Sequence, residues 1–304
     1  SYAVGGSFTS ESLSVNGEIL TNMSGKDGVI AGYTSTGTLD WAVRMAGTGK
    51  DEVVALTKAA NGEIAVIGNY EGELDLDGDD SYELTSIGQQ DGFFAKYDTN
   101  GNLDWYKTIG SSNTDRLNSI ITLEDGNYVI VGSYGGDVDL DEDSTNDLTT
   151  KGSFDGMILK YNSTGTFISS QTLGGNADDV ISSVVETQDG GLLIGGYTYS
   201  TGIDFNGDSV NDKYPLYGYT DGFIVKYDSD YNYSWNKNIT GNGMDEVITV
   251  SELSTGEYIA GGWFSSTSLN VGQDSTEENL TLDQYTDAFL VKYGDIVVSP
   301  EIPD

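Results

Sequence analysis

Short runs of four to eight mainly apolar residues, each ending in a polar turn, repeat along the chain. One kind of run contains glycine and recurs as YAVGGSF, EIAVIGNY, NYVIVGSY, GLLIGGYT and EYIAGGWF. A second kind begins with Asp and recurs as DGVIAGY, DGFFAKY, DGMILKY, DGFIVKY and DAFLVKY. Apolar runs of this length that stop at Gly, Asn or Asp are typical of β-strands. The pattern therefore predicts an all-β chain.

The second kind of run sets the period of an internal repeat. Its first residues are separated by 64, 64, 66 and 66 positions: Asp27, Asp91, Asp155, Asp221 and Asp287. Segments that begin DEVVALTK, DRLNSIIT, DDVISSVVE and DEVITVSE recur in the same phase. One unit thus reads as four antiparallel strands, which we name a (DEVV), b (the glycine-containing run), c (DGFF) and d (LDWYKT). Four-stranded units in tandem are typical of β-propellers.

We therefore expect residues 1–294 to form a β-propeller of five four-stranded blades, with about 64–66 residues per repeat. The chain opens inside strand b of repeat one, so that strand a of this repeat is missing. Strand c of repeat five ends at Tyr293. Residues 296–298 are apolar enough for a short outer strand, and we expect 295–304 to link to a further domain. We expect either that the native protein continues at both ends or that one blade is closed by an unusual strand.

The sequence D-G/A-F-x-x-K-Y, a Trp, a Gly-rich turn and then strands a and b resembles the bacterial extracellular SBBP-type β-propeller repeats. This resemblance covers nearly the whole chain and implies the propeller fold. It implies a surface or secreted module and no particular activity. The loop between strands b and c is longer here than in those repeats.

That b–c loop carries regularly spaced acids in repeats two, three and four: DLDGDDSYE, DLDEDSTND and DFNGDSVND. Positions 1, 3, 5 and 9 hold eleven carboxylates and one amide: Asp75, Asp77, Asp79 and Glu83; Asp139, Asp141, Asp143 and Asp147; Asp204, Asn206, Asp208 and Asp212. Ca²⁺ takes six to eight oxygen ligands in a flexible cage, whereas Mg²⁺ demands a tight octahedron and keeps its waters. The spacing therefore predicts Ca²⁺ as the cofactor of these three loops.

The spacing also resembles the calcium loops in the propellers of integrin α-subunits. Those loops have Gly after position 5, where this chain has Asp80, Ser144 and Ser209. Repeat five offers a weaker set, because Gly272 stands at position 3 between Asn270 and the acids Asp274 and Glu278. Repeat one offers one carboxylate, Glu18, among Ser14, Asn16 and Asn22.

The charge and the composition of the chain exclude several classes of partner and of catalytic or metal site. The net charge is −36, with 49 acids and 13 bases, which disfavours nucleic acid and anionic membranes as partners. The chain has no Cys and no His, so disulfides, zinc sites with these ligands, Cys nucleophiles and His bases are excluded. No apolar run approaches the roughly eighteen residues of a membrane span. Calcium-loop modules bind Ca²⁺ at concentrations found outside cells, so we expect an extracellular or cell-surface location.

We expect a calcium-stabilised binding or adhesion module whose partner is an unknown protein or glycan. A spacer or stalk domain of a large surface protein is an alternative, and a carboxylate-based glycoside hydrolase is another. The enzyme is disfavoured because the acids fall in phase, whereas catalysis needs unique residues. The candidate ligand-binding aromatics are Trp263 and a cluster outside the repeat phase, Tyr214, Tyr217 and Tyr219. The in-phase Trp and Lys residues are interpreted as structural, and repeat one has Gly32 in place of the Lys.

Overall fold

The computed structural model describes the chain apart from residues 24, 209, 213–215, 273–278, 282–284 and 295–304. The described residues form strands and one short 3₁₀ turn, η1 (Ala60–Gly62), as the sequence predicts for an all-β chain. The chain divides into two compact units. One unit contains Ser1–Val184 and Thr198–Pro215, and the other contains Val185–Tyr197 and Leu216–Asp304.

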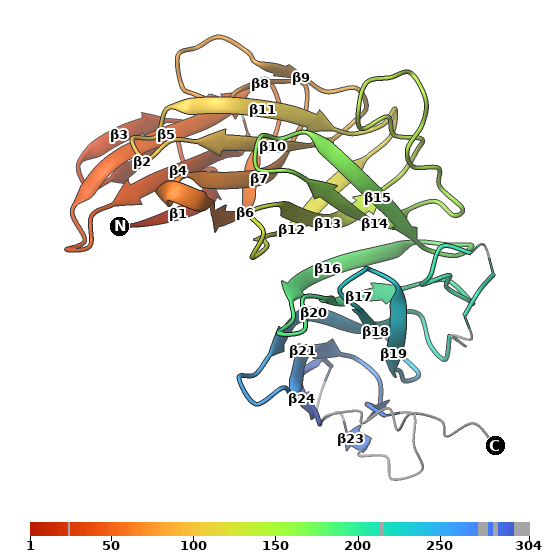
Figure 1. Cartoon of the computed structure of the whole chain (residues 1–304). Helices are drawn as coiled ribbons and strands as arrows, with labels where there is room; N and C mark the ends of the chain where they lie inside the picture. Colours follow the sequence, from red (N-terminus) through yellow and green to blue (C-terminus); the bar gives the residue numbers. More distant parts are fainter. Residues whose placement is uncertain (24, 209, 213–215, 273–278, 282–284, 295–304) are drawn as a thin grey trace, which may run out of the picture. The chain divides into compact units, whose positions relative to one another are not determined.

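Repeats two and three each form one antiparallel sheet of four strands in the predicted order (Figure 1). The strands of repeat two are β6 (Glu52–Lys58), β7 (Ile64–Tyr70), β10 (Asp91–Tyr97) and β11 (Leu103–Ile109). Those of repeat three are β12 (Asp115–Thr122), β13 (Tyr128–Tyr134), β14 (Asp155–Tyr161) and β15 (Phe167–Leu173). Strands a, b, c and d are neighbours in this order in both sheets.

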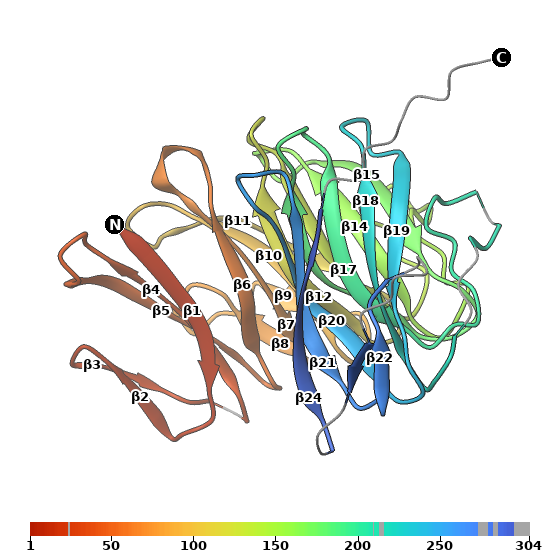
Figure 2. The same cartoon turned by 90° about the horizontal axis from the view of Figure 1, so that it is seen from below.

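Repeat one has strands b, c and d, namely β1 (Tyr2–Phe8), β4 (Asp27–Tyr33) and β5 (Leu39–Gly47). Its sheet has no strand a of its own among the described residues, as the phase of the repeat predicts. The b–c loop of repeat one forms a separate hairpin of β2 (Ser12–Val15) and β3 (Glu18–Thr21) (Figure 2). Asn16 and Gly17 at its turn have φ of 53° and 99°, which fits an Asn-Gly type I′ turn.

Repeat four contributes β16 (Asp179–Glu186), β17 (Leu192–Thr198), β18 (Asp221–Tyr227) and β19 (Tyr233–Ile239) in the places of strands a to d. Repeat five contributes the sheet of β20 (Asp245–Glu252), β21 (Tyr258–Phe264) and β24 (Asp287–Tyr293) as strands a, b and c. Its b–c loop carries the hairpin of β22 (Ser268–Asn270) and β23 (Asn279–Thr281). The outer strand and linker expected at 295–304 lie outside the described residues.

Burial explains why strands b and c are apolar runs while strand d alternates. Every residue of β7 and β10 is buried, because these central strands are covered on both faces. The outer strand β11 alternates between half-buried and exposed positions over most of its length. A β-bulge recurs where strand c meets strand d, for example at Lys96/Tyr97 and Lys160/Tyr161. Such bulges increase the local twist of each sheet.

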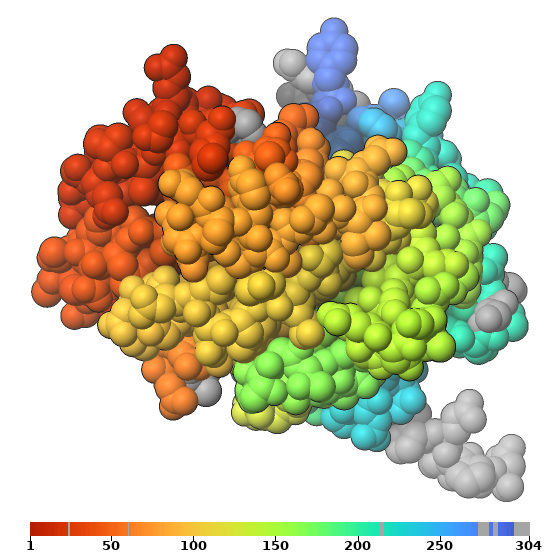
Figure 3. Space-filling view, turned by 90° about the horizontal axis from the view of Figure 1, so that it is seen from above, coloured from red at the N-terminus to blue at the C-terminus, as the bar shows by residue number. Residues whose placement is uncertain are grey.

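Consecutive repeats of the first unit are joined by hydrogen bonds as well as by apolar contacts. Asn69 on strand b of repeat two exchanges two bonds with the backbone of Leu117 on strand a of repeat three, at 2.8 and 3.3 Å. The Asp115 N–H, which opens that strand, donates to the Gln90 carbonyl at 2.8 Å. Figure 3 shows the segments of these two repeats side by side on one face, in orange to yellow-green.

Candidate functional site

The acidic loop of repeat two is held against the outer strand of repeat one. Its short strands β8 (Glu73–Asp75) and β9 (Leu84–Thr85) extend the sheet of β1, β4 and β5, and Asp75 pairs with Ala46 at the end of β5. Gly47 is required there, since a Cβ at this position would lie 1.7 Å from the Glu73 carbonyl oxygen. The Tyr97 hydroxyl donates to the Leu76 carbonyl at 2.8 Å and fixes the loop to strand c. The loop therefore spans two repeats.

The three acidic loops share one backbone hydrogen-bond pattern. In repeat two, Asp75 accepts from the N–H groups of Gly78 and Asp80, at 2.7 and 2.9 Å. Asp77 and Asp79 each accept from the N–H two residues later, and Glu83 accepts from the Leu76 N–H at 2.6 Å. In repeats three and four, the side chains at positions 1, 3, 5 and 9 accept the same backbone N–H bonds wherever the donor is described. These side chains are Asp139, Asp141, Asp143, Asp147, Asp204, Asn206, Asp208 and Asp212.

The curl of these loops depends on left-handed backbone at positions 4 and 6. Gly78 and Gly207 at position 4 have φ of 80° and 76°, but Glu142 has φ of 65° at the same position of repeat three. At position 6, Asp80 and Ser144 have φ of 69° and 72°. This backbone conformation explains why a Gly suits position 6 in loops of this spacing. The chain keeps the curl at both described positions without a Gly.

Two of the loops bring carboxylates together as a metal site requires. Oxygen atoms of Asp75, Asp77, Asp79 and Glu83 all lie within 4.8 Å of one another, and so do those of Asp139, Asp141 and Asp147. Asp143 stands outside the second group, and its Oδ1 accepts from the Thr145 N–H at 2.8 Å. In these two loops both oxygens of the position-1 side chain, and one oxygen of each position-3 and position-5 side chain, accept backbone hydrogen bonds, which orients the carboxylates. Calcium occupancy of these groups stays a prediction.

The acidity of the carboxyls reflects their crowding. The pKa of Asp77 is raised by partial loss of solvent and by the neighbouring charges of Asp79 and Asp75. The pKa of Glu83 is raised mainly by burial, and the negative charges of Asp77 and Asp75 raise it further. The pKa of Asp79 is lowered, because the hydroxyl and N–H of Ser81 donate to its carboxylate. A divalent cation would relieve the repulsion that raises the first two pKa values.

The loop of repeat four differs because a lysine reaches its position-1 ligand. The Lys151 ammonium lies 2.5 Å from Asp204 Oδ2, and Asp204 is completely buried. Asp204 also pairs with Gly174 at the end of β15, so that this loop too joins the preceding repeat. Among the described residues, the acids of this loop do not form a close group of three. The ammonium group thus already pairs with one oxygen of the position-1 carboxylate.

The remaining sequence candidates are more scattered. In repeat five, Asn270 Oδ1 accepts from the Gly272 N–H at 2.9 Å, while Asp274 and Glu278 lie outside the described residues, as does Tyr214. Tyr217 and Tyr219 precede β18 and are 66% and 74% exposed. Trp263 is half-buried on β21, opposite Glu246 of β20 and Ala288 of β24. Exposed rings at Tyr217 and Tyr219 fit a contact surface.

Sequence reasoning interpreted the Asp residues that open strand c as structural partners of the in-phase lysines, and it assigned no role to the Asp residues at the start of strand a. Eight of them are completely buried: Asp27, Asp51, Asp91, Asp115, Asp155, Asp179, Asp221 and Asp245. Asp115 Oδ2 accepts from the Ser111 N–H at 2.6 Å, so its carboxylate caps the preceding turn. Burial raises the pKa of Asp51 to about 8, with Asp27 and Glu71 adding to the rise. The sequence signal for these buried carboxylates was their recurrence in phase, at the first residue of a strand or, for Asp51, directly before it.

Comparison with known proteins places the chain among repeat proteins. No family model matches it. In an alignment 223 residues long, which covers 64% of the chain, it is 23% identical to an uncharacterised WD repeat-containing protein of Acanthamoeba polyphaga mimivirus. The matched stretch spans 16% of that protein's length. Among the described residues, none of the helical structure is long and apolar enough to cross a membrane. Recurrent four-stranded antiparallel sheets and a WD-repeat relative together fit a β-propeller repeat protein.

Proposed function

We propose that this chain is a calcium-stabilised, five-bladed β-propeller that works at the cell surface as a binding or adhesion module. The observation that carries the proposal is the shared loop geometry, in which three in-phase loops direct carboxylate or amide oxygens by the same backbone bonds. In two of these loops the oxygens lie within 4.8 Å of one another. A WD-repeat relative supports a protein-interaction role.

Calcium would act here as a cross-link between consecutive repeats. Position 1 of the loop, Asp75 or Asp204, pairs with the end of strand d of the preceding repeat. The residues at positions 3, 5 and 9 lie further along the loop, so an ion bound by all four positions would tie the loop to the preceding repeat. Without metal, three or four carboxylates repel one another at this junction. An ion that binds the folded state alone stabilises it by about 2.7 kcal/mol per site at a hundredfold excess over its Kd.

The surface location follows from the affinity expected of such loops. Calcium modules outside cells bind with Kd of about 0.1–1 mM, and their site is filled only where calcium is abundant. A titration of the protein with calcium measures this directly. Kd values in that range support the extracellular proposal, whereas nanomolar values would place the loops among intracellular buffers and refute it.

The test of the metal role compares wild type with Asp77→Asn in repeat two, using a calcium titration and thermal melts in calcium and in chelator. Asp77 offers an oxygen to the close group, and its replacement by Asn, the residue that repeat four has at this position, should weaken this site by removing one negative charge. Asp98→Asn is the matched control, because Asp98 belongs to the c–d turn and its carboxylate accepts from Asn100 and Asn102. Equal calcium binding by all three proteins would contradict the proposal.

A further inference from the structure

The acidic loops of repeats two, three and four differ in the basic side chain that approaches them. In repeat four, the Lys151 ammonium lies 2.5 Å from Oδ2 of Asp204, the completely buried carboxylate at position 1. Among the described residues, no base forms an ion pair with the acids of the repeat-three loop. The nine loop residues include five acids in repeat two and five in repeat three, but three in repeat four. The lysine thus serves the loop with the fewest negative charges.

Lys151 stands at a position that recurs four residues before the Asp of strand c, and we call it the pre-strand position. Its residues in repeats one to four are Met23, Ile87, Lys151 and Tyr217. In all four repeats, the backbone N–H at this position donates to the carboxylate of that Asp. The same bond therefore fixes the point from which each of the four side chains leaves the backbone. Lys151 is the basic residue among them.

Within the first unit, the pre-strand side chain lies beside the acidic loop of the following repeat. Lys151 of repeat three reaches Asp204 of repeat four. Ile87 of repeat two and Asp139, at position 1 of the repeat-three loop, line one cavity of about 500 Å³. A lysine at the pre-strand position therefore brings an ammonium group to the position-1 carboxylate. An apolar residue there leaves that carboxylate to a cation from solution.

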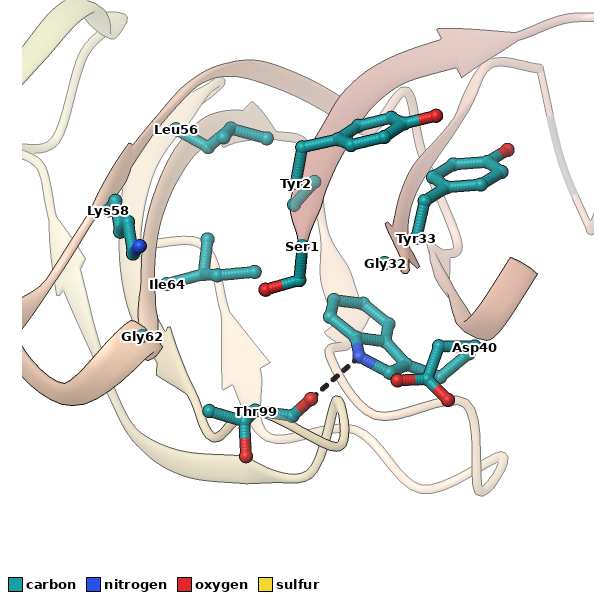
Figure 4. Close-up of a pocket in the computed structure, with 12 residues that line it drawn as sticks. Ser1, Tyr2, Gly32, Tyr33, Asp40, Leu56, Lys58, Gly62, Ile64 and Thr99 are labelled. Atoms are coloured by element: carbon teal, nitrogen blue, oxygen red, sulfur yellow. Dashed lines mark hydrogen bonds between the residues drawn. The ribbon is translucent and has the colours of Figure 1, made fainter. Parts of the chain in front are cut away.

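Repeat two has an intermediate arrangement, because an arginine approaches its loop from strand β5 of repeat one. This strand is fixed to repeat two by the Trp41 Nε1–H, which donates to the Thr99 carbonyl at 3.0 Å, the dashed line in Figure 4. Arg44 Nη2 lies 2.8 Å from Asp80 Oδ1 and 4.0 Å from Asp75 Oδ2. Asp80 is at position 6, which is not a ligand position. The arginine therefore lies farther from the position-1 carboxylate than the lysine of repeat four does.

The charge around each loop should set its calcium affinity. Calcium sites are tuned by the number of charged ligands and by the rigidity of the loop. An ammonium group that already pairs with a buried carboxylate reduces the attraction left for a second cation. The repeat-three loop combines five acids with no paired base, whereas the repeat-four loop combines three acids with a paired lysine. The repeat-two loop lies between them.

We propose that Lys151 is a built-in counter-ion that neutralises the repeat-four loop in place of calcium, and that the pre-strand residue tunes the calcium affinity of the next loop. The loops then fill in a fixed order, with repeat three first, repeat two second and repeat four last. This inference rests on the proposed function, because it ranks the sites which that function requires. The counter-ion role of the lysine also applies to the metal-free protein, where it can be measured separately.

The test transplants the lysine to repeat two with Ile87→Lys. Ile87 is 64% exposed, and any residue except proline keeps its backbone bond to Asp91. The matched control is Ile19→Lys, which adds the same charge at a position that is 62% exposed, on the β2–β3 hairpin of repeat one. In chelator, Ile87→Lys should raise Tm by about 2 °C or more relative to this control, because the new ammonium relieves the repulsion among the repeat-three carboxylates.

A calcium titration followed by NMR resolves the three loops. The reporters are the position-4 N–H groups that donate to the position-1 carboxylates, namely Gly78, Glu142 and Gly207 in repeats two, three and four. In the wild type, the midpoint should be lowest for Glu142 and highest for Gly207. Ile87→Lys should raise the Glu142 midpoint by about threefold or more and leave the other two unchanged. Ile19→Lys should leave all three unchanged.

Lys151→Met is the second variant and keeps the test decisive if Ile87→Lys does not fold. Met stands at the pre-strand position of repeat one, so the fold accepts it there. In chelator, this variant should have a lower Tm than the wild type, because the buried Asp204 loses its counter-ion. In the titration, its Gly207 midpoint should fall towards that of Gly78.

The outcomes separate this inference from the proposed function. Calcium binding at all three loops with equal midpoints, or first at Gly207, would overturn the inference and leave the proposed function standing. A Glu142 midpoint that responds equally to Ile87→Lys and Ile19→Lys would also overturn it. If calcium binds to none of the proteins, the proposed function fails and the melts in chelator decide the role of the lysine. Equal Tm values for Lys151→Met and the wild type would then refute the built-in counter-ion.

Discussion

Replacing Glu142 by Gly should stabilise the protein, although it removes a side chain from an acidic loop. Glu142 has φ of 65° at position 4 of its loop, where repeats two and four have Gly78 and Gly207. A non-glycine residue pays about 1–2 kcal/mol in left-handed backbone. The greater freedom of glycine in the unfolded chain offsets about 0.4–1 kcal/mol of that gain. The net stabilisation should be about 1 kcal/mol.

Thermal and urea unfolding in the presence of chelator measure this change apart from metal binding. A gain of about 1 kcal/mol corresponds to a rise in Tm of about 2–4 °C for a unit of this size. Glu142→Ala is the control, since it removes the same charge but keeps the Cβ that causes the strain. The reciprocal change, Gly207→Ala, should cost about 1 kcal/mol for conformational reasons alone, because no atom lies within 4 Å of its added Cβ. If Glu142→Gly stabilises no more than Glu142→Ala, the shared loop geometry is wrong.

Two other predictions concern charge. The metal-free protein should be more stable near pH 5 than near pH 8, because burial raises the pKa of Asp51 to about 8, of Asp179 to about 7 and of Asp91 to about 6. These carboxyls bind more protons in the folded state than in the unfolded state. Their contribution to the free energy of unfolding is therefore complete below the pKa of the unfolded chain, near 4, and is lost as the pH rises through each folded pKa. Melts of chelator-treated protein across this range measure the effect, and a steady rise of Tm towards pH 8 would contradict it. Lys151→Gln should raise the calcium affinity of the repeat-four loop several-fold, since it removes the ammonium group 2.5 Å from Asp204. A titration that resolves the individual sites measures this affinity, and an unchanged value would show that the lysine does not compete with calcium for Asp204.

The repeat and its strands could be predicted because the same apolar runs recur at a fixed spacing. The phase also predicted that the given residues of repeat one supply strands b, c and d, and these strands are β1, β4 and β5 of one sheet. The grouping of acids in the loops of repeats two and three was predictable, since the acids alternate along DLDGDD and its equivalent.

Other features depend on contacts between distant residues and could not be predicted from the spacing. Lys151 reaches Asp204 across 53 positions, so nothing near the repeat-four loop indicates its presence. The left-handed backbone of Glu142 and Ser144 is imposed by the loop's hydrogen bonds against local preference. Gly32 was visible as an exception to the in-phase lysines, but only the structure shows that the Trp41 indole fills the space beside it.

The most direct test of the calcium proposal is a calorimetric titration of chelator-treated protein with CaCl₂, paired with melts at the same calcium concentrations. We predict about three sites with Kd near 0.1–1 mM, and a Tm that rises with the logarithm of calcium concentration above Kd. Absence of binding heat together with an unchanged Tm would contradict the account and leave the acidic loops as solvated surface.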